Sequence, residues 1–279
     1  MTKENTGLQE IIIDSNCVQK EYLKDIFRYR ELLYFMAWRD IIVRYKQTAL
    51  GVIWAAFRPL ITMAVFAFVF GRVANLARDN VNYPLFVLSG LLPWLFFSAS
   101  LIDTSATLIN NVHMISKIYF PRMVLPISNI IVHFVDFSIS LVLLFIFLLF
   151  SGNLNHWTLL LIPFFIVQTF SLCLGTGLWL SAIMVRYRDF RFIIPFLVQV
   201  GIFISPVGYS SFLMSEKLQF IYFLNPMVGI IEGFRWCCLG NYHQNLFFAI
   251  AISCIVNLAI LVSGFRYFRK MERICADII

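Results

Sequence analysis

Residues 30–71, RELLYFMAWRDIIVRYKQTALGVIWAAFRPLITMAVFAFVFG, decide the fold, and their character changes at the middle. In the first half, helical steps of about 100° separate an apolar, aromatic face from a charged face. The apolar face holds Tyr34, Phe35, Trp38, Ile41, Ile42, Tyr45 and Ala49, and the charged face holds Arg39, Asp40, Arg44, Lys46 and Gln47. Such a helix suits the plane of a membrane surface, where rings enter the headgroup layer. This half alone also allows a soluble helix packed on a core.

The second half of the stretch is long and apolar enough to cross a bilayer. Residues 51–71 carry a single charge, Arg58. At about 1.5 Å per residue they cover roughly the ~30 Å hydrocarbon core. We therefore predict an interface helix that leads directly into a first crossing.

The composition excludes an ordinary soluble domain. Of the 279 residues, 60% are hydrophobic and 13% charged, whereas about a quarter of a soluble domain is charged. The net charge of +7 would suit a nucleic-acid partner, but the basic residues lie between apolar runs. Membrane orientation explains them better, so we expect membrane lipid and no nucleic acid as a partner.

Further apolar runs predict six crossings in total. After the first, they lie at residues 83–102, 123–150, 157–185, 192–215 and 246–265. Residues 218–231 are only 14 uncharged positions and are too short to cross. We expect them to form an external re-entrant segment, interrupted at Asn225 and Pro226. The fold class is thus an all-α polytopic membrane protein with a transmembrane domain over residues 51–271.

The distribution of basic residues predicts the orientation. Seventeen Lys and Arg fall in the pieces assigned to the cytoplasm and four in the external pieces. This bias places both termini inside, with residues 1–50 as a tail and interface helix and residues 272–279 as a second tail. Residues 1–20 are polar without periodicity and predict a flexible tail. No short apolar run with a cleavage site precedes residue 50, so a cleaved signal peptide is not expected.

The sequence lacks the common motifs for phosphate binding and catalysis that we searched for. It contains no GxxxxGK[ST] phosphate loop, no HExxH and no GxSxG. The six cysteines lack metal-ligand spacing, and a disulfide between Cys237 and Cys238, in a predicted external loop, is disfavoured because they are adjacent. We therefore expect no enzyme, no metal and no cofactor bound by this chain. Six crossings are few for a pore in one chain, which favours a dimer.

Four ordered motifs carry a resemblance to a known family. They are WRDIIVRYKQTALGVIWAAFRPL at 38–60, LSGLLPWLFFS at 88–98, VRYRDFRFIIPFLVQVGIFISPVGY at 185–209 and LNPMVGIIEGFR at 224–235. Together they resemble the permease subunit of type-2 ATP-binding-cassette exporters over residues 30–270. Within that group, the chain is most similar to exporters of lipid-linked polysaccharide, such as O-antigen, capsule or teichoic acid chains.

The resemblance implies partners and a location. It implies a homodimer in the bacterial cytoplasmic (inner) membrane, two copies of a separate ATPase subunit that binds ATP and Mg, and an undecaprenyl-linked glycan as substrate. In such permeases the ATPase contacts the interface helix and the loop after the second crossing, here residues 22–50 and 104–122. External half-helices near the exit would lie at residues 208–243. The candidate ATPase-coupling residues are Arg39, Asp40, Arg44, Lys46, Asn111, His113, Met114, Lys117, Ile118 and Tyr119.

Aromatic residues and buried charges predict the transport pathway. Flat rings can line a channel and stack on sugars, although most of the 30 Phe can equally face lipid. The candidate pathway residues are Trp54, Arg58, Trp94, Phe97, Asp136 and Tyr209. Arg58 stands where the family resemblance implies an uncharged residue.

The two charges deepest in the predicted membrane are Arg58 and Asp136, and we expect both to face protein or water. For Arg58 the alternatives are snorkelling to the cytoplasmic surface and a direct pair with Asp136. In the external segment, Glu232 and Arg235 stand three apart and predict an exposed pair on one helical face.

Two other functions stay open at this point. One is a type-2 permease for a small hydrophobic compound, and the other is a membrane scaffold that transports nothing. An adjacent ATPase gene would exclude the scaffold, and adjacent glycosyltransferase genes would favour the glycan.

Overall fold

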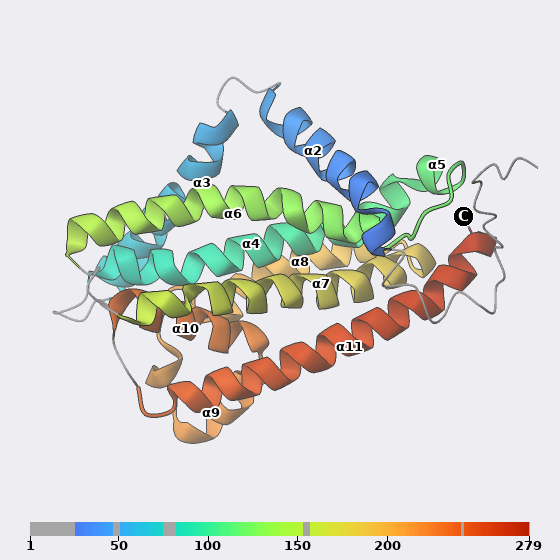
Figure 1. The fold of residues 1–279 in the computed structure, drawn as a ribbon. Helices are drawn as coiled ribbons and strands as arrows, with labels where there is room; N and C mark the ends of the chain where they lie inside the picture. Colours follow the sequence, from blue (N-terminus) through green and yellow to red (C-terminus); the bar gives the residue numbers. More distant parts are fainter. Residues whose placement is uncertain (1–25, 47–50, 75–81, 153–156, 241–242, 279) are drawn as a thin grey trace, which may run out of the picture.

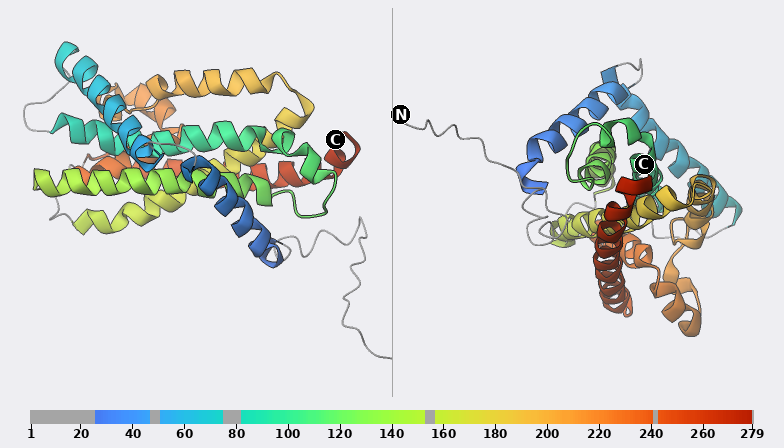
Figure 2. Two further views of the ribbon diagram at one scale, coloured as in Figure 1. Left: turned by 90° about the horizontal axis from the view of Figure 1, so that it is seen from above. Right: turned by 90° about the vertical axis from the view of Figure 1, so that its right-hand side faces the viewer.

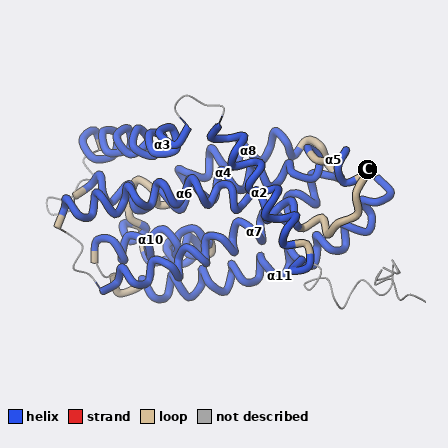
Figure 3. The backbone as a smooth tube through the Cα atoms, turned by 45° about the horizontal axis from the view of Figure 1, so that its top comes forward, coloured by secondary structure: helices blue, strands red, loops and turns tan. Residues whose placement is uncertain are grey.

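The computed structural model describes residues 26–46, 51–74, 82–152, 157–240 and 243–278. Within these ranges every regular element is a helix, as Figure 3 shows. The expected all-α class is therefore confirmed. The expected flexible tail, residues 1–20, lies outside the described residues.

The helices follow the chain in the order shown in Figure 1. They are α2 (Arg30–Lys46), α3 (Gly51–Phe66) with its π-helical continuation η2 (Ala67–Val73), α4 (Tyr83–Asn110), α5 (Val112–Ile115), α6 (Val124–Ser151), η4 (Trp157–Leu161), α7 (Ile162–Arg186), α8 (Phe190–Ile204), η5 (Ser211–Leu213), α9 (Glu216–Phe223), α10 (Pro226–Leu239) and α11 (Leu246–Ile278).

Five helical stretches are long and apolar enough to cross a membrane. They are Gly51–Val73, Tyr83–Asn110, Val124–Ser151, Trp157–Arg186 and Leu246–Glu272. The fifth predicted crossing, residues 192–215, is shorter than expected, because α8 has 15 residues and ends at Ile204. Ser205 is already extended, as the residue before a proline prefers. The count of six crossings stays a prediction.

The bundle has two distinct ends, visible in Figure 1. One end carries α5 and the last turns of α11, and we call it the α5 end. The other carries η4, α9 and α10, and we call it the α10 end. Helix α4 lies at the centre, in contact with α3, α6, α7, α8 and α10. Helices α2 and α3 cover one side of this bundle and α11 lies on the opposite side (Figure 2).

Small residues allow the closest helix contacts. A Cβ added to Gly264 of α11 would meet the backbone oxygen of Gly175 of α7 at 2.3 Å. On the other side of α7, a Cβ at Gly177 would meet Cγ2 of Thr104 in α4 at 2.7 Å. Close backbone approach at small residues is the usual way in which membrane helices pack without a hydrophobic driving force. Glycine therefore fixes the contact of α7 with both of its neighbours.

A second, smaller core lies at the α5 end. It brings together Met36 of α2, Leu108 of α4, Leu178 of α7 and Phe268 of α11, all buried. Residues far apart in sequence thus hold the start of α2 against three helices of the bundle.

Two helix boundaries and the position of two cysteines differ from the sequence prediction. Helix α4 continues to Asn110, because no helix breaker follows residue 102, so the predicted loop 104–122 is helical in its first part. Helix α11 runs through the expected boundary at 271/272 to Ile278. Cys237 and Cys238 lie buried in α10 rather than in an external loop, and both are free thiols.

Candidate functional site

Helix α2 packs on α6 by one side and leaves its aromatic side exposed. Met36 and Ala37 are each 4% exposed, whereas Tyr34 and Trp38 are 58% and 50% exposed. The rings of Tyr34 and Trp38 stack with their centroids 6.1 Å apart. Rings in this position are available to a headgroup layer, as the sequence predicted for this face.

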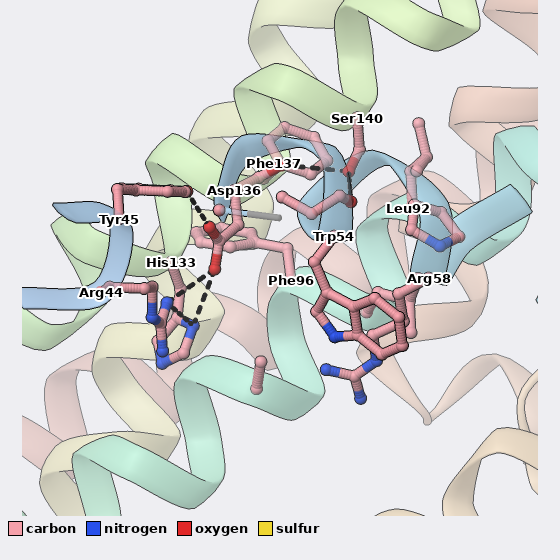
Figure 4. Close-up of a pocket in the computed structure, with 15 residues that line it drawn as sticks. Arg44, Tyr45, Trp54, Arg58, Leu92, Phe96, His133, Asp136, Phe137 and Ser140 are labelled. Atoms are coloured by element: carbon pink, nitrogen blue, oxygen red, sulfur yellow. Dashed lines mark hydrogen bonds and ion pairs between the residues drawn. The ribbon is translucent and has the colours of Figure 1, made fainter. Parts of the chain in front are cut away.

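The other end of α2 is fixed by a network of charged and polar side chains, of which Figure 4 labels Arg44, Tyr45, His133 and Asp136. Arg44 Nη1 donates to Asp136 Oδ2 of α6 at 2.6 Å, and Tyr45 donates its hydroxyl proton to Asp136 Oδ1. Arg44 Nη2 lies 3.6 Å from Asp103 Oδ2 of α4. His133 Nε2 lies 2.7 Å from the same Asp103 oxygen. We call these five residues the α2 joint, because they connect α2 to both α4 and α6.

The geometry of the joint fixes where its protons lie. Arg44 Nη1 lies 3.3 Å from His133 Nδ1. An arginine can only donate, so Nδ1 accepts and Nε2 carries the proton that His133 donates to Asp103. Burial raises the pKa of Tyr45 above its ordinary value, and the hydrogen bond to Asp136 raises it further. Tyr45 therefore stays protonated and remains a donor to Asp136 at neutral pH.

Two sequence predictions are corrected by the joint. The helical wheel placed Arg44 on the same outward side as Arg39 and Lys46, but Arg44 points to the bundle because Asp136 pairs with it. Arg58 does not pair with Asp136, whose carboxylate accepts from Arg44 and Tyr45 within the described chain. The prediction that Asp136 faces protein is confirmed. A contact of Arg44 with an ATPase stays a prediction.

A cavity of about 380 Å³ lies beside the joint, between α3, α4 and α6. Three of the six predicted pathway residues line it together: Trp54, Arg58 and Asp136. Trp54 and Arg58 stand one turn apart on α3, as Figure 4 shows. The remaining wall is mostly apolar and includes Leu92 and Phe96 of α4.

The other predicted pathway residues lie elsewhere. Trp94 is 5% exposed and its ring fills the space beside Gly201 of α8, where an added Cβ would meet it at 2.7 Å. Phe97 is half-buried, with its ring 5.8 Å from that of Trp94. Tyr209 Oη lies 2.9 Å from the hydroxyl of Tyr222 in α9. These three residues are held by packing in this chain, and their part in a pathway stays a prediction.

The predicted coupling loop contains the short helix α5. His113, Lys117, Ile118 and Tyr119 are exposed, and Met114 is half-buried against the core of the α5 end. Asn111 Nδ2 donates to the Thr107 carbonyl at 2.9 Å. The loop is helical only over residues 112–115, so Ile118 and Tyr119 lie beyond α5.

The end of the coupling loop is tied to α11. The backbone N–H of Arg122 donates to Glu272 Oε1 at 3.0 Å, and Arg122 Nη1 donates to the Glu272 carbonyl at 3.1 Å. Together with the shared core, these bonds connect α5, the start of α2 and the end of α11. The coupling loop and the start of α2 thus lie together at one well-anchored end of the molecule.

At the α10 end, the chain breaks where the sequence predicted. Asn225 Oδ1 accepts from the backbone N–H of Met227 at 3.0 Å and caps α10, and Pro226 occupies the first turn. Both residue types favour these positions. The interruption at Asn225 and Pro226 is confirmed, whereas the re-entry of this segment into a membrane stays a prediction.

The pair Glu232 and Arg235 is buried, so the predicted exposed pair is wrong. The two residues are 4% and 3% exposed, and Arg235 Nη1 lies 3.4 Å from Glu232 Oε1. Glu232 Oε1 also accepts from the backbone N–H and the hydroxyl of Ser211, at 2.7 and 2.8 Å. The burial follows from the loop between α8 and η5, which folds over α10. We call Glu232, Arg235 and their partners in this loop the α10 clamp.

Arg235 directs its remaining donors to the same loop and to α4, where its Nε donates to the Phe86 carbonyl at 3.3 Å. Its Nη2 donates to the Val207 carbonyl at 2.6 Å and its Nη1 to the Tyr209 carbonyl at 2.9 Å. Its guanidinium carbon lies 3.8 Å from the centre of the Phe86 ring of α4. Burial lowers the pKa of Arg235, and the Glu232 carboxylate opposes that shift. The clamp therefore fixes the loop that carries Tyr209.

Sequence reasoning missed Asp103, His133 and Tyr45 as members of the joint. A signal was present, because His133 and Asp136 lie three residues apart in an apolar run and therefore share a helical face. Ionisable residues inside an apolar helix call for a partner on a neighbouring element. The partner, Arg44, lies 92 residues away from Asp136 in sequence.

Five helices that are long and apolar enough to cross a membrane define the class, a multi-pass membrane protein. Comparison with known proteins gives the particular family. The sequence model of the ABC-2 type transporter family matches residues 31–239, and the chain belongs to that family.

Curated relatives cover most of the chain. It is 29% identical over 216 residues to the O-antigen export system permease protein RfbA of Myxococcus xanthus, which covers 76% of this chain and 82% of the relative. It is 26% identical over 253 residues to a protein of the same name from Klebsiella pneumoniae, covering 89% and 95%. It is 23% identical over 218 residues to the polysialic acid transport protein KpsM of Escherichia coli, covering 73% and 80%.

Proposed function

We propose that this chain is the membrane-spanning subunit of an exporter that moves a lipid-linked polysaccharide across the bacterial cytoplasmic membrane. A separate ATPase subunit binds ATP and Mg and supplies the energy. Two copies of each subunit form the exporter. The family membership and the names of the relatives support a polysaccharide as the class of cargo.

The observation that carries this proposal is the connection of α2 to the bundle at both of its ends. Its first turns share a core with α4, α7 and α11, and its last turn is bound to α6 through Arg44 and Asp136. A force applied to the α5 end therefore reaches the helices that line the cavity. Such a connection is what a permease needs when its energy comes from another subunit, because coupling travels through packed and hydrogen-bonded elements.

The α5 end is the docking surface for the ATPase. It presents exposed side chains from the coupling loop, such as Lys117, Ile118 and Tyr119, and Arg39 and Lys46 are exposed farther along α2. This end is then cytoplasmic, which agrees with the bias of basic residues and places both termini inside. The α10 end faces outward, where the glycan leaves.

The cargo is an undecaprenyl-linked glycan. Its lipid part is apolar, its linkage carries phosphate and its sugars present flat faces that stack on aromatic rings. The cavity between α3, α4 and α6 combines an exposed indole, an exposed guanidinium and an apolar wall. This chemistry supports an amphiphilic cargo.

Removal of this chain from cells that make the glycan tests the proposal. We expect lipid-linked glycan to accumulate inside the cell and to vanish from the surface, as measured by surface labelling and by fractionation. Expression of the wild-type chain restores export. Normal surface glycan in its absence contradicts the proposal, and so does a loss that affects only the efflux of small hydrophobic compounds.

A further inference from the structure

The cavity beside the α2 joint contains two arginines in different electrostatic situations. Arg44 is neutralised by Asp136 at 2.6 Å and by Asp103 at 3.6 Å. Arg58 is exposed, and none of the described residues pairs with it. Its positive charge is therefore uncompensated within the described chain.

The surroundings of Arg58 do not hydrate it well. It lies seven residues after Gly51, the first residue of α3, which is about 10 Å along the helix axis. Trp54, Pro59, Leu92 and Phe96 line the same cavity. A guanidinium at this depth of a membrane requires water or an anion, because an isolated charge in apolar surroundings is costly.

The geometry favours an anion that belongs to a lipid. A guanidinium presents a planar fork of donors, which matches phosphate oxygens in a bidentate manner. The apolar wall beside Arg58 suits a hydrocarbon chain and not a free inorganic ion. The depth of Arg58 is slightly below the headgroup layer, within reach of a lipid phosphate because the arginine side chain is long.

We propose that the cavity between α3, α4 and α6 binds the phosphoryl group of an anionic membrane lipid through Arg58. The lipid chain lies along Trp54, Leu92 and Phe96. Two lipids share this chemistry, an anionic phospholipid and an isoprenoid pyrophosphate such as the carrier of the glycan. Binding of the isoprenoid pyrophosphate rests on the proposed function, whereas binding of an anionic phospholipid is independent of it.

Native mass spectrometry of the full chain with its ATPase subunit, released from nanodiscs, tests the site. The nanodiscs contain phosphatidylcholine with either phosphatidylglycerol or undecaprenyl pyrophosphate. We expect Arg58→Gln to retain at least about tenfold less of one or both anionic lipids, since a charged hydrogen-bonding partner is lost. Arg58→Lys retains an intermediate amount, because it keeps the charge and loses the fork.

Arg72→Gln is the matched control, since Arg72 is exposed at the far end of the same apolar stretch. This variant should retain both lipids as the wild type does. Loss of only phosphatidylglycerol, or of only undecaprenyl pyrophosphate, in Arg58→Gln supports the site and identifies its lipid. Equal retention by Arg58→Gln and wild type overturns the proposal, as does an equal loss in Arg72→Gln. Binding of phosphatidylglycerol does not depend on export. If the chain does not export a glycan, the loss of phosphatidylglycerol in Arg58→Gln can therefore still be measured, and the two proposals fail separately.

Discussion

Two ion-paired arginines, Arg235 and Arg44, differ in burial and in what they connect. Arg235 of the α10 clamp is 3% exposed and binds a carboxylate of its own helix, two carbonyls of one loop and the Phe86 carbonyl of α4. Arg44 of the α2 joint keeps a third of its side chain exposed and connects three separate helices. The clamp is a fixed part of the fold, whereas water can replace the partners of the joint.

This difference in burial has an energetic consequence. Breaking a buried pair by removing one partner costs about 3–5 kcal/mol, because the other charge remains without compensation. A half-exposed pair costs less to break, since water solvates both groups. A joint that opens at moderate cost suits an element that moves during transport.

The largest effect is expected when the clamp loses Arg235. Arg235→Leu leaves Glu232 and the carbonyls of Val207 and Tyr209 without their donor, so we expect a loss of about 3–5 kcal/mol of stability. Thermal unfolding of the purified chain measures it. Arg235→Lys, which keeps the charge, should lose less. An unchanged unfolding temperature in Arg235→Leu would show that the clamp is not a fixed part of the fold.

The coupling loop should show loss of function with little loss of fold. In Met114→Asp with Ile118→Asp, two charges enter the apolar contact surface of the α5 end, so we expect an inserted protein without ATPase association or export. Co-elution with the ATPase and surface glycan measure both. Ser116→Ala, at an exposed neighbouring position outside the candidate coupling residues, serves as control. Full association and normal export in the double variant would remove this loop from coupling and leave α2 as the contact.

A moderate effect is expected when the joint loses its ion pair. Arg44→Gln removes a charged hydrogen bond, generally worth about 1.5–3 kcal/mol, so we expect export to fall about tenfold while the chain remains inserted. ATP hydrolysis without matching export, measured in proteoliposomes, is the sign of a loosened joint. Arg30→Gln is the control on the same helix, because Arg30 is exposed at the first position of α2 and is not one of the candidate coupling residues.

A charge swap distinguishes the ion pair from general disturbance of α2. Arg44→Asp with Asp136→Arg restores opposite charges at the same two positions, and we expect export above that of either single variant. A double variant as inactive as the single ones would show that the pairing itself does not matter.

The sequence predicted the parts of the fold that depend on local pattern. Residues 51–71 and 123–150 form long helices because apolar length alone determines a crossing. The break before α10 was visible in Asn225 and Pro226, which have local preferences for a helix start. The predicted ends of α4 and α8 were less accurate, because an apolar run does not mark where a helix ends.

The charged sites could not be predicted in the same way. A helical wheel divides α2 into faces, but which face meets the bundle depends on Asp136, 92 residues away. Likewise, Glu232 and Arg235 read as an exposed pair because the donors and acceptors that bury them are backbone groups of the loop over residues 207–211. Backbone partners leave no pattern in the side-chain sequence.

The smallest effect is expected at Tyr45, the neutral member of the joint. Tyr45→Phe keeps the ring and removes one hydrogen bond to Asp136, while Arg44 still pairs with that carboxylate. Because a neutral donor to a half-exposed carboxylate contributes only about 0.5–1.5 kcal/mol, we expect export to fall by no more than about tenfold and by less than in Arg44→Gln. Export by wild type and variant, measured at several pH values, checks this.

The pH dependence at Tyr45 follows from the direction of its pKa shift. The folded pKa lies above the ordinary value of 10.0, so the hydrogen bond contributes fully below that pH and is lost only as the pH rises through the folded pKa. The ratio of wild-type to Tyr45→Phe export should therefore stay constant across the neutral range. A ratio that changes in this range would mean that another residue of the joint titrates and opens it. The joint would then differ from the clamp in protonation as well as in burial.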